Sequence, residues 1–214
     1  MSAHIIAITG ASGSGKSHLT DHLCESLRGQ VNLAVIREDS YYRDQSHLPF
    51  AQRHGVNYDH PESLEHELLA YHLRQLKAGN PVEVPEYDYS QHNRRAVTTT
   101  VQGHSLILLE GILLLSNPIL RELFDLALFV DTPLDVCFNR RLARDVRDRG
   151  RTEESVRSQF ESTVKPMFFE FIEPNKEYAQ IMISGDSDIQ IMLAEIQQLV
   201  LPLARPYTLS SDHS

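Results

Sequence analysis

The chain has 214 residues, of which 41% are hydrophobic and 23% charged, and its formal net charge is −9. These values are typical of a soluble globular protein with one well-buried core, and no apolar run is long enough to cross a bilayer. Because nucleic-acid binding normally relies on a basic surface, the acidic balance argues against nucleic acid as a partner. The start MSAHIIAITG carries neither a basic segment nor an export-type cleavage site, so we expect a cytoplasmic protein that does not bind membranes.

Apolar, β-prone runs alternate along the chain with segments of helical period, which predicts a mainly parallel sheet built from βαβ units. Strands are predicted at 4–9, 31–36, 105–110, 126–130 and 180–183. Helices are predicted at 16–28, 61–78, 117–124, 133–148, 153–171 and 187–201. Two short β-rich runs within 80–104 interrupt this alternation and predict an inserted hairpin. We expect one α/β domain over 1–204 and a flexible tail at 205–214.

The first predicted strand runs into GASGSGKS, which matches the phosphate-binding pattern G-x-x-x-x-G-K-[ST] between a strand and a helix. Backbone N–H groups of such a loop, and the start of the following helix, face the phosphates of a nucleotide. Lys16 is expected to reach the β- and γ-phosphates, and the Ser17 hydroxyl to bind Mg²⁺. The expected nucleotide-binding residues are Gly10, Ala11, Ser12, Gly13, Ser14, Gly15, Lys16 and Ser17. This motif predicts a three-layer fold of the P-loop NTPase type.

One acid stands at the end of the apolar strand predicted at 105–110. Glu110 and the glycine after it are the only breaks in the run LILLEGILLL. A carboxylate at the carboxyl end of a central strand lies beside the nucleotide crevice of an open α/β sheet, where it can bind Mg²⁺ or its water. The alternative is a strand-end glutamate exposed to solvent.

The segment RRLARDVRDRGR, residues 140–151, holds six arginines and two aspartates in an otherwise acidic chain. We call it the arginine segment. One interpretation is a solvated helix face with ion pairs between residues four apart. The other is a lid over about 140–160, whose guanidinium groups close over a transferring phosphoryl group and stabilise its developing charge. Gly150 offers a flexible or left-handed position within the segment.

The stretch VIREDSYYRD, residues 35–44, begins as an apolar strand and turns abruptly acidic. Its pattern leaves two interpretations of Asp39, an exposed acid at a strand end or a carboxylate at a reaction centre. Glu38, Arg43 and Asp44 are expected to face solvent.

Taken together, these motifs resemble the uridine kinase (uridine–cytidine kinase) family of P-loop nucleoside kinases over about residues 4–184. The phosphate loop alone is shared by many unrelated NTPases, so the resemblance depends on motifs beyond it. These are EDSYY after the second strand, NYDHPE, PEYDYSQHNR, EGILLL, FVDTPLDV, the arginine segment ending RGR, and TVKPMFFEFIEPNKEYA.

The resemblance implies a role for each matching position. Asp39 is implied to be the catalytic base, which accepts the proton of the nucleoside 5′-hydroxyl, and Asp59 and Arg141 to hold the ribose hydroxyls. The implied pyrimidine pocket consists of Tyr42, Tyr58, Tyr87 and His92, with Gln159 as a further nucleoside-side residue. The catalytic set implied beside Asp39 is Lys16, Arg144, Arg149 and Arg151. The expected Mg²⁺ site comprises Ser17, Glu110 and Asp39. Glu65 departs from the aspartate that is more usual in the family.

The function that the resemblance implies is phosphoryl transfer from ATP or GTP to uridine or cytidine, with Mg²⁺ as cofactor and small nucleosides and nucleotides as partners. A homotetramer and feedback inhibition by CTP or UTP are also implied by the resemblance. One alternative is a related P-loop kinase acting on pantothenate or ribulose 5-phosphate. Another is a nucleotide-dependent switch that hydrolyses or holds NTP without an acceptor.

Overall fold

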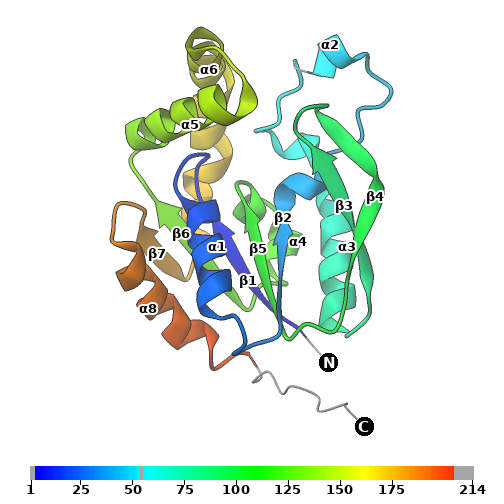
Figure 1. The fold of residues 1–214 in the computed structure, drawn as a ribbon, viewed down its shortest axis with the longest axis vertical. Coiled ribbons are helices and arrows are strands. Elements are labelled where there is room, and N and C mark those ends of the chain that lie inside the picture. Colours follow the sequence, from blue (N-terminus) through cyan, green and yellow to red (C-terminus); the bar gives the residue numbers. More distant parts are fainter. Residues whose placement is uncertain (1–2, 54, 205–214) are drawn as a thin grey trace.

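The computed structural model describes residues 3–53 and 55–204, and the tail expected at 205–214 lies outside these residues. A five-stranded parallel sheet in the order β2-β5-β1-β6-β7 forms the centre of the protein (Figure 1). The strands are β1 His4–Thr9, β2 Leu33–Arg37, β5 Leu106–Gly111, β6 Leu126–Asp131 and β7 Ile181–Ser184. The predicted parallel α/β fold is confirmed, with every strand within two residues of its expected bounds.

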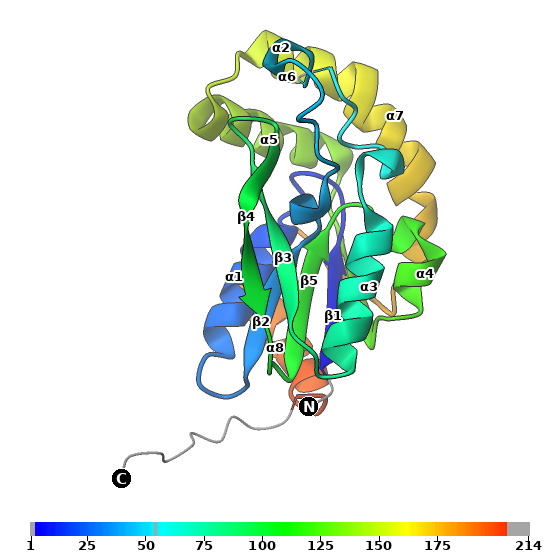
Figure 2. The ribbon, with the colours of Figure 1, turned by 90° about the vertical axis from the view of Figure 1, so that its right-hand side faces the viewer.

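Helices cover both faces of the sheet, as Figures 1 and 2 show. The main helices are α1 Lys16–Ser26, α3 His66–Lys77, α5 Leu134–Arg149, α6 Glu153–Gln159 and α8 Ile189–Val200. Shorter helices are α2 Phe50–Arg53, α4 Pro118–Arg121 and α7 Lys165–Met167. Two π-helical stretches, Phe160–Val164 and Phe168–Ile172, flank α7, and 3₁₀ turns span Glu38–Tyr41, Pro61–Ser63, Leu114–Ser116 and Pro174–Tyr178. No helix in the described ranges is both long enough and apolar enough to span a membrane.

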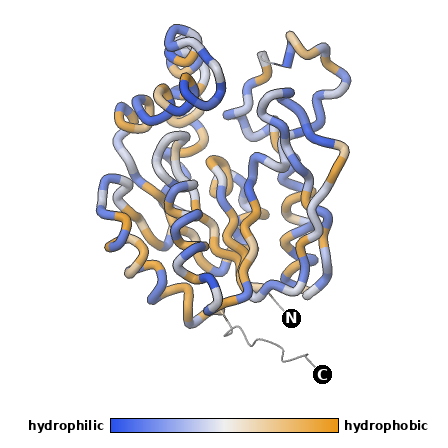
Figure 3. The backbone as a smooth tube through the Cα atoms, viewed as in Figure 1, coloured by the Kyte–Doolittle hydropathy of each residue, from blue (hydrophilic) through white to orange (hydrophobic). Residues whose placement is uncertain are grey.

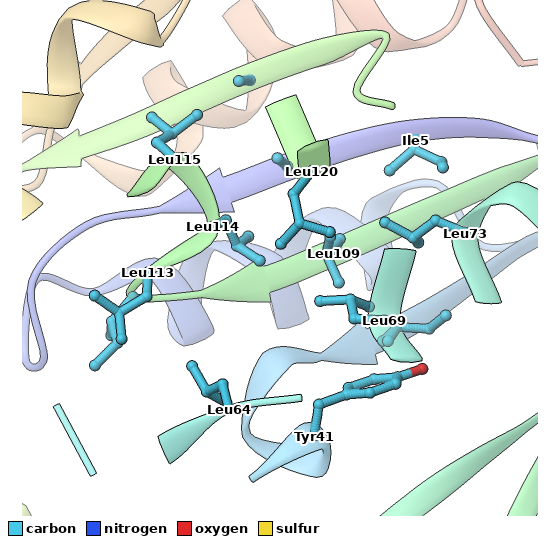
Figure 4. Close-up of a cluster of buried hydrophobic side chains, with 14 of the residues drawn as sticks. Ile5, Tyr41, Leu64, Leu69, Leu73, Leu109, Leu113, Leu114, Leu115 and Leu120 are labelled. Carbon is cyan, nitrogen blue, oxygen red and sulfur yellow. The ribbon is translucent and has the colours of Figure 1, made fainter. Parts of the chain in front are cut away.

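Two buried clusters form the core, one on each face of the sheet. Alternate residues of a strand point to opposite faces, so Ile5 joins the cluster that includes Leu69 and Leu73 of α3 (Figure 4). Its neighbour Ile6 joins the cluster that includes Leu19 of α1. The strands are accordingly hydrophobic along most of their length (Figure 3). This rigid sheet fixes the positions at which the loops emerge from its carboxyl edge.

The prediction of a helix at 61–78 is wrong for its first turn. Residues 61–63 form a 3₁₀ turn, and Leu64 is extended and forms an antiparallel bridge with Tyr42. The Arg43 N–H donates to the Ser63 carbonyl at 2.8 Å, and the Glu65 N–H donates to the Tyr41 carbonyl at 2.8 Å. These hydrogen bonds to residues 41 and 43 replace helical ones, and α3 therefore begins only at 66.

The inserted hairpin is present as predicted. Its strands, β3 Val82–Asp88 and β4 Asn93–Val101, pair antiparallel and form a separate two-stranded sheet. The register shifts between Pro85 and Tyr87, which bends the strand before its tip. One domain over 1–204 stays a prediction.

Candidate active site

The phosphate loop connects β1 to α1 at the carboxyl edge of the sheet. Gly10 has φ +145°, and a Cβ there would lie 2.6 Å from the Val130 carbonyl oxygen, so only glycine fits at this position. Lys16 is 7% exposed, and its Nζ lies 3.5 Å from the Ala11 carbonyl oxygen. The lysine charge is therefore held over the loop, where the phosphates of a nucleotide would bind.

Glu110 is the penultimate residue of β5, lies beside this loop and is buried, which contradicts the alternative of a solvent-exposed glutamate. Its Oε1 accepts a hydrogen bond from Ser17 Oγ at 2.9 Å and lies 3.8 Å from Lys16 Nζ. Arg37 Nη1 lies 3.7 Å from Oε2. The serine hydroxyl and the carboxylate thus place two neighbouring oxygen atoms, both able to bind a metal ion, at the edge of the loop.

These two oxygen ligands fit Mg²⁺. The ion prefers oxygen ligands and usually takes only one or two from the protein, with water and phosphate completing its shell. Within residues 3–53 and 55–204 no group of three or more His, Cys, Asp or Glu side chains could hold a metal ion by itself. The Ser17–Glu110 pair therefore suits an ion that arrives with a nucleotide rather than one held in a protein cage.

A cavity of about 970 Å³ opens from the loop. In Figure 1 the carboxyl edge of the sheet lies below α5 and α6 on one side and the tip of the hairpin on the other. Of the loop residues, Ser12, Lys16 and Ser17 line the cavity. The other predicted site residues that line it are Asp39, Tyr42, Tyr58, Asp59, Tyr87, His92, Glu110, Arg141, Arg144, Arg149, Arg151 and Gln159. The structure therefore brings residues from six separate motifs, together with Gln159, into one cavity.

Asp39 lies in the 3₁₀ turn η1 (Glu38–Tyr41), directly after β2. Its Oδ2 accepts a hydrogen bond from the Tyr89 hydroxyl at 2.7 Å. The guanidinium group of Arg149 lies over the Tyr89 ring, 5.0 Å from its centroid. The carboxylate thus meets the hairpin on one side of the cavity and lies near the arginine segment.

The expectation that Glu38 faces solvent is wrong, because Glu38 is 0% exposed. Its Oε1 lies 2.8 Å from His66 Nε2, and its Oε2 accepts the Leu113 N–H at 2.9 Å. A strand-end acid is buried here because two polar partners satisfy it. These contacts fix the turn that carries Asp39 against α3 and the residues after β5. Arg43 and Asp44 are exposed, as expected.

Four aromatic rings form one wall of the cavity. The ring centroids of Tyr42 and Tyr58 are 5.1 Å apart, and those of Tyr42 and Tyr87 are also 5.1 Å apart. His92 stacks at a tilt on Tyr58, with centroids 5.8 Å apart. Burial, and then the charge of Asp39, raise the pKa of Tyr42. The tyrosine hydroxyls of this wall stay neutral at physiological pH. The rings present flat, partly polar surfaces to a ligand.

Arg141 connects the phosphate loop to the far side of the cavity. Its Nη1 donates to Ser12 Oγ at 2.9 Å and lies 3.8 Å from Asp59 Oδ1, and its Nη2 donates to Gln159 Oε1 at 3.2 Å. Asp59 is 6% exposed, and burial raises the pKa of its carboxyl, an effect that the charge of Arg141 opposes. Asp59 therefore presents carboxyl oxygens to the cavity beside a guanidinium group, where they can hold hydroxyl groups.

Four arginines of the arginine segment lie around a single carboxylate. Asp145 is 0% exposed, and its Oδ1 lies 2.8 Å from Arg144 Nη2 and 3.5 Å from Arg149 Nη1. Its Oδ2 lies 3.6 Å from Arg151 Nη1 and 3.7 Å from Arg141 Nε. Ion pairs between residues four apart are present, but their shared acid is buried rather than solvated. Gly150 ends α5 in the left-handed conformation, with φ +62°.

Comparison with known proteins assigns the family. Residues 5–191 match the family described as phosphoribulokinase / uridine kinase. The chain belongs to this family. A uridine kinase of Shewanella amazonensis is 53% identical over 204 residues, which cover 92% of this chain and 96% of the relative. A uridine kinase of Shewanella sp. strain W3-18-1 is 55% identical over 203 residues, which also cover 92% and 96%.

Solved kinases share the fold at low identity. Phosphoribulokinase from Rhodobacter spheroides aligns with a TM-score of 0.64 at 18% identity and covers 86% of this chain and 73% of that chain. D-glycerate 3-kinase from Cryptococcus neoformans aligns with a TM-score of 0.61 at 18% identity and covers 79% of each chain. As a member of the phosphoribulokinase / uridine kinase family, the chain is a P-loop kinase and a transferase.

Some residues of this kinase site carried no signal that a sequence pattern could use. Tyr89 lies inside the motif PEYDYSQHNR, but nothing in the motif separates its hydroxyl from those of its neighbours. Arg37 is the last residue of β2, and its contact with Glu110 depends on the pairing of β2 with β5. Asp145 is one of two aspartates in a charge run, and only the folded structure distinguishes it from Asp148, by its burial and its four arginine neighbours.

Proposed function

We propose that the chain is a uridine kinase, which transfers the γ-phosphoryl group of ATP or GTP to the 5′-hydroxyl of uridine or cytidine and yields UMP or CMP. The observation that carries this proposal is the position of Asp39 in a cavity that has the phosphate loop at one end and an aromatic wall at the other. Relatives at 53% and 55% identity that are named uridine kinase support the choice of acceptor.

Asp39 acts as the general base. As the 5′-oxygen attacks the γ-phosphorus, its proton passes to the Asp39 carboxylate, and the bond between the γ-phosphorus and the bridging oxygen of ADP breaks. A carboxylate within hydrogen-bond reach can orient such a nucleophile, although charge neutralisation contributes more in a loose transition state. Lys16, Arg144, Arg149 and Arg151 supply that neutralisation from the cavity wall.

Mg²⁺ would be held by Ser17 and Glu110, with Asp39 lining the same cavity, and when bound it would neutralise phosphate charge. The loop residues 10–17 bind the phosphates through their backbone N–H groups. This arrangement explains why a buried lysine and a buried glutamate lie 3.8 Å apart at the phosphate loop.

Nucleoside recognition uses the opposite part of the cavity. Asp59 accepts hydrogen bonds from the ribose hydroxyls, while Arg141 holds Asp59 in place. Tyr42, Tyr58 and Tyr87 provide ring faces for the pyrimidine, and His92 reads its polar edge. Gln159, which contacts Arg141, completes this side.

A panel of acceptors tests the proposal. Purified protein is incubated with Mg·ATP and uridine, cytidine, thymidine, adenosine, pantothenate or ribulose 5-phosphate, and ADP and phosphorylated product are followed. We expect ADP formation above the no-acceptor rate with uridine and cytidine. Turnover with pantothenate or ribulose 5-phosphate alone would instead show one of the related kinases. ADP formed at one rate with every acceptor, or with none, would show a nucleotide-dependent switch.

The wider properties expected from the sequence and from the resemblance stay predictions. They are a homotetramer, feedback inhibition by CTP or UTP, a cytoplasmic location in pyrimidine salvage, and closure of residues 140–160 as a lid.

A further inference from the structure

Tyr89 stands at the tip of the β3–β4 hairpin, fifty positions along the chain from Asp39. Its hydroxyl nevertheless donates to Asp39 Oδ2 at 2.7 Å, and its ring lines the cavity. A contact this short between distant segments needs both of them to be held in place. The hairpin therefore delivers a hydrogen-bond donor directly to the carboxylate that we propose as the general base.

The tip of the hairpin is built to hold this side chain. Asp88 Oδ1 accepts hydrogen bonds from the N–H groups of Ser90 at 2.9 Å and Gln91 at 3.3 Å, which closes the turn around Tyr89. The rings of Tyr87 and Tyr89 pack edge to face, with centroids 5.2 Å apart. The turn and the neighbouring ring thus restrict the rotation of Tyr89.

The Tyr89 hydroxyl is a hydrogen-bond donor to Asp39. A tyrosine hydroxyl ordinarily keeps its proton up to about pH 10, and Tyr89 donates this proton in its hydrogen bond to the Asp39 carboxylate. The guanidinium group of Arg149 lies 5.0 Å from the ring centroid. The hydroxyl therefore keeps its proton at physiological pH, so it can orient a carboxylate but does not compete with it for a proton.

We propose that Tyr89 is a positioning residue, which engages Oδ2 of Asp39 so that Oδ1 is directed to the 5′-hydroxyl of the acceptor. This inference rests on the proposed function. In the reaction the 5′-hydroxyl proton moves to Asp39 Oδ1, the new O–P bond forms, and the bond to ADP breaks. Tyr89 keeps its own proton throughout and acts only through Asp39. Without the phenolic donor, the carboxylate rotates between orientations, of which only some can accept the proton.

Tyr89→Phe removes the donor and keeps the ring that packs on Tyr87 and Arg149. Because Tyr89→Phe loses a hydrogen bond to a charged group, we expect kcat to fall about tenfold. We expect KM for uridine and for ATP to stay within about twofold, because Tyr89 is not proposed to bind either substrate. Tyr71→Phe is the matched control, since Tyr71 lies on α3, is exposed, and does not line the cavity. Both variants should melt within about 2 °C of the wild type.

A double-mutant cycle with Asp39→Asn separates positioning from a structural role. In the Asp39→Asn background, adding Tyr89→Phe should change kcat by less than about twofold, because the carboxylate it orients is gone. A further tenfold loss in that background would overturn the inference, as would a wild-type kcat in the single Tyr89→Phe variant. In both of these outcomes the wild-type protein still phosphorylates uridine. Absence of that turnover would instead refute the proposed function itself, so the two failures are distinguishable.

Discussion

Asp145→Asn removes the one negative charge around which four guanidinium groups gather, and it leaves the shape of the side chain almost unchanged. Removing one partner of a buried ion pair costs about 3–5 kcal/mol. Here the side chains of Arg144 and Arg149 are 35% and 36% exposed, so solvent screens part of the loss. Asparagine also keeps an acceptor oxygen for Arg144. We therefore expect a loss of about 2 kcal/mol, which lowers Tm by about 4–8 °C for a protein of this size.

Mg·ATP should reverse much of this loss, because a triphosphate brings negative charge to the arginines that line the cavity. The measurement is thermal unfolding with and without saturating Mg·ATP, and we expect a larger rise in Tm for Asp145→Asn than for the wild type. The control is Asp148→Asn, since Asp148 lies on the same helix and pairs with Arg147 at 2.7 Å in solvent. Its Tm should stay near that of the wild type. Equal Tm values for all three proteins, or equal shifts with Mg·ATP, would refute the reasoning.

Three further predictions follow from the same contacts. Asp39→Asn should lower kcat about 10²-fold or more with the KM for ATP little changed, as measured by steady-state kinetics, and near-normal turnover would place the base elsewhere. Asp59→Ala should raise the nucleoside KM about tenfold through lost hydrogen bonds to a charged acceptor, and an unchanged KM would remove Asp59 from the ribose site. Burial raises the pKa of the Cys137 thiol to about 11, so its thiolate fraction grows only as the pH rises toward that value. At pH 8 iodoacetamide should therefore label the half-buried Cys24 but label Cys137 only in urea, and equal labelling of the native protein would contradict this burial.

The sequence predicted the sheet and the phosphate loop because both are governed by local patterns. Each core strand is a continuous apolar run, and the loop is a complete motif between a strand and a helix. The first turn of the helix expected at 61–78 failed for the opposite reason. Its backbone groups bond to Tyr41 and Arg43, which are distant in the sequence, and no helical period reveals such partners.

The site shows the same division between local and distant causes. Glu110 could be placed at the crevice because it ends an apolar strand, and the structure finds it buried there. Glu38 was expected in solvent because an acid beside other polar residues is usually exposed, whereas His66 and the Leu113 N–H satisfy it in the core. Tyr89 and Asp145 likewise acquire their contacts only when the hairpin and α5 reach the cavity. Residues whose role depends on a folded partner could not be separated from their neighbours by pattern alone.

The most direct test of the proposed activity compares uridine with 5′-deoxyuridine, which differs only in lacking the hydroxyl that Asp39 would deprotonate. With wild-type protein and Mg·ATP, both ADP and the 5′-monophosphate are quantified over the same time course. We predict that uridine yields ADP and UMP in equal amounts, and that 5′-deoxyuridine yields ADP only at the rate seen without an acceptor. ADP release that is equally fast with both compounds, or that occurs without UMP, would contradict the account.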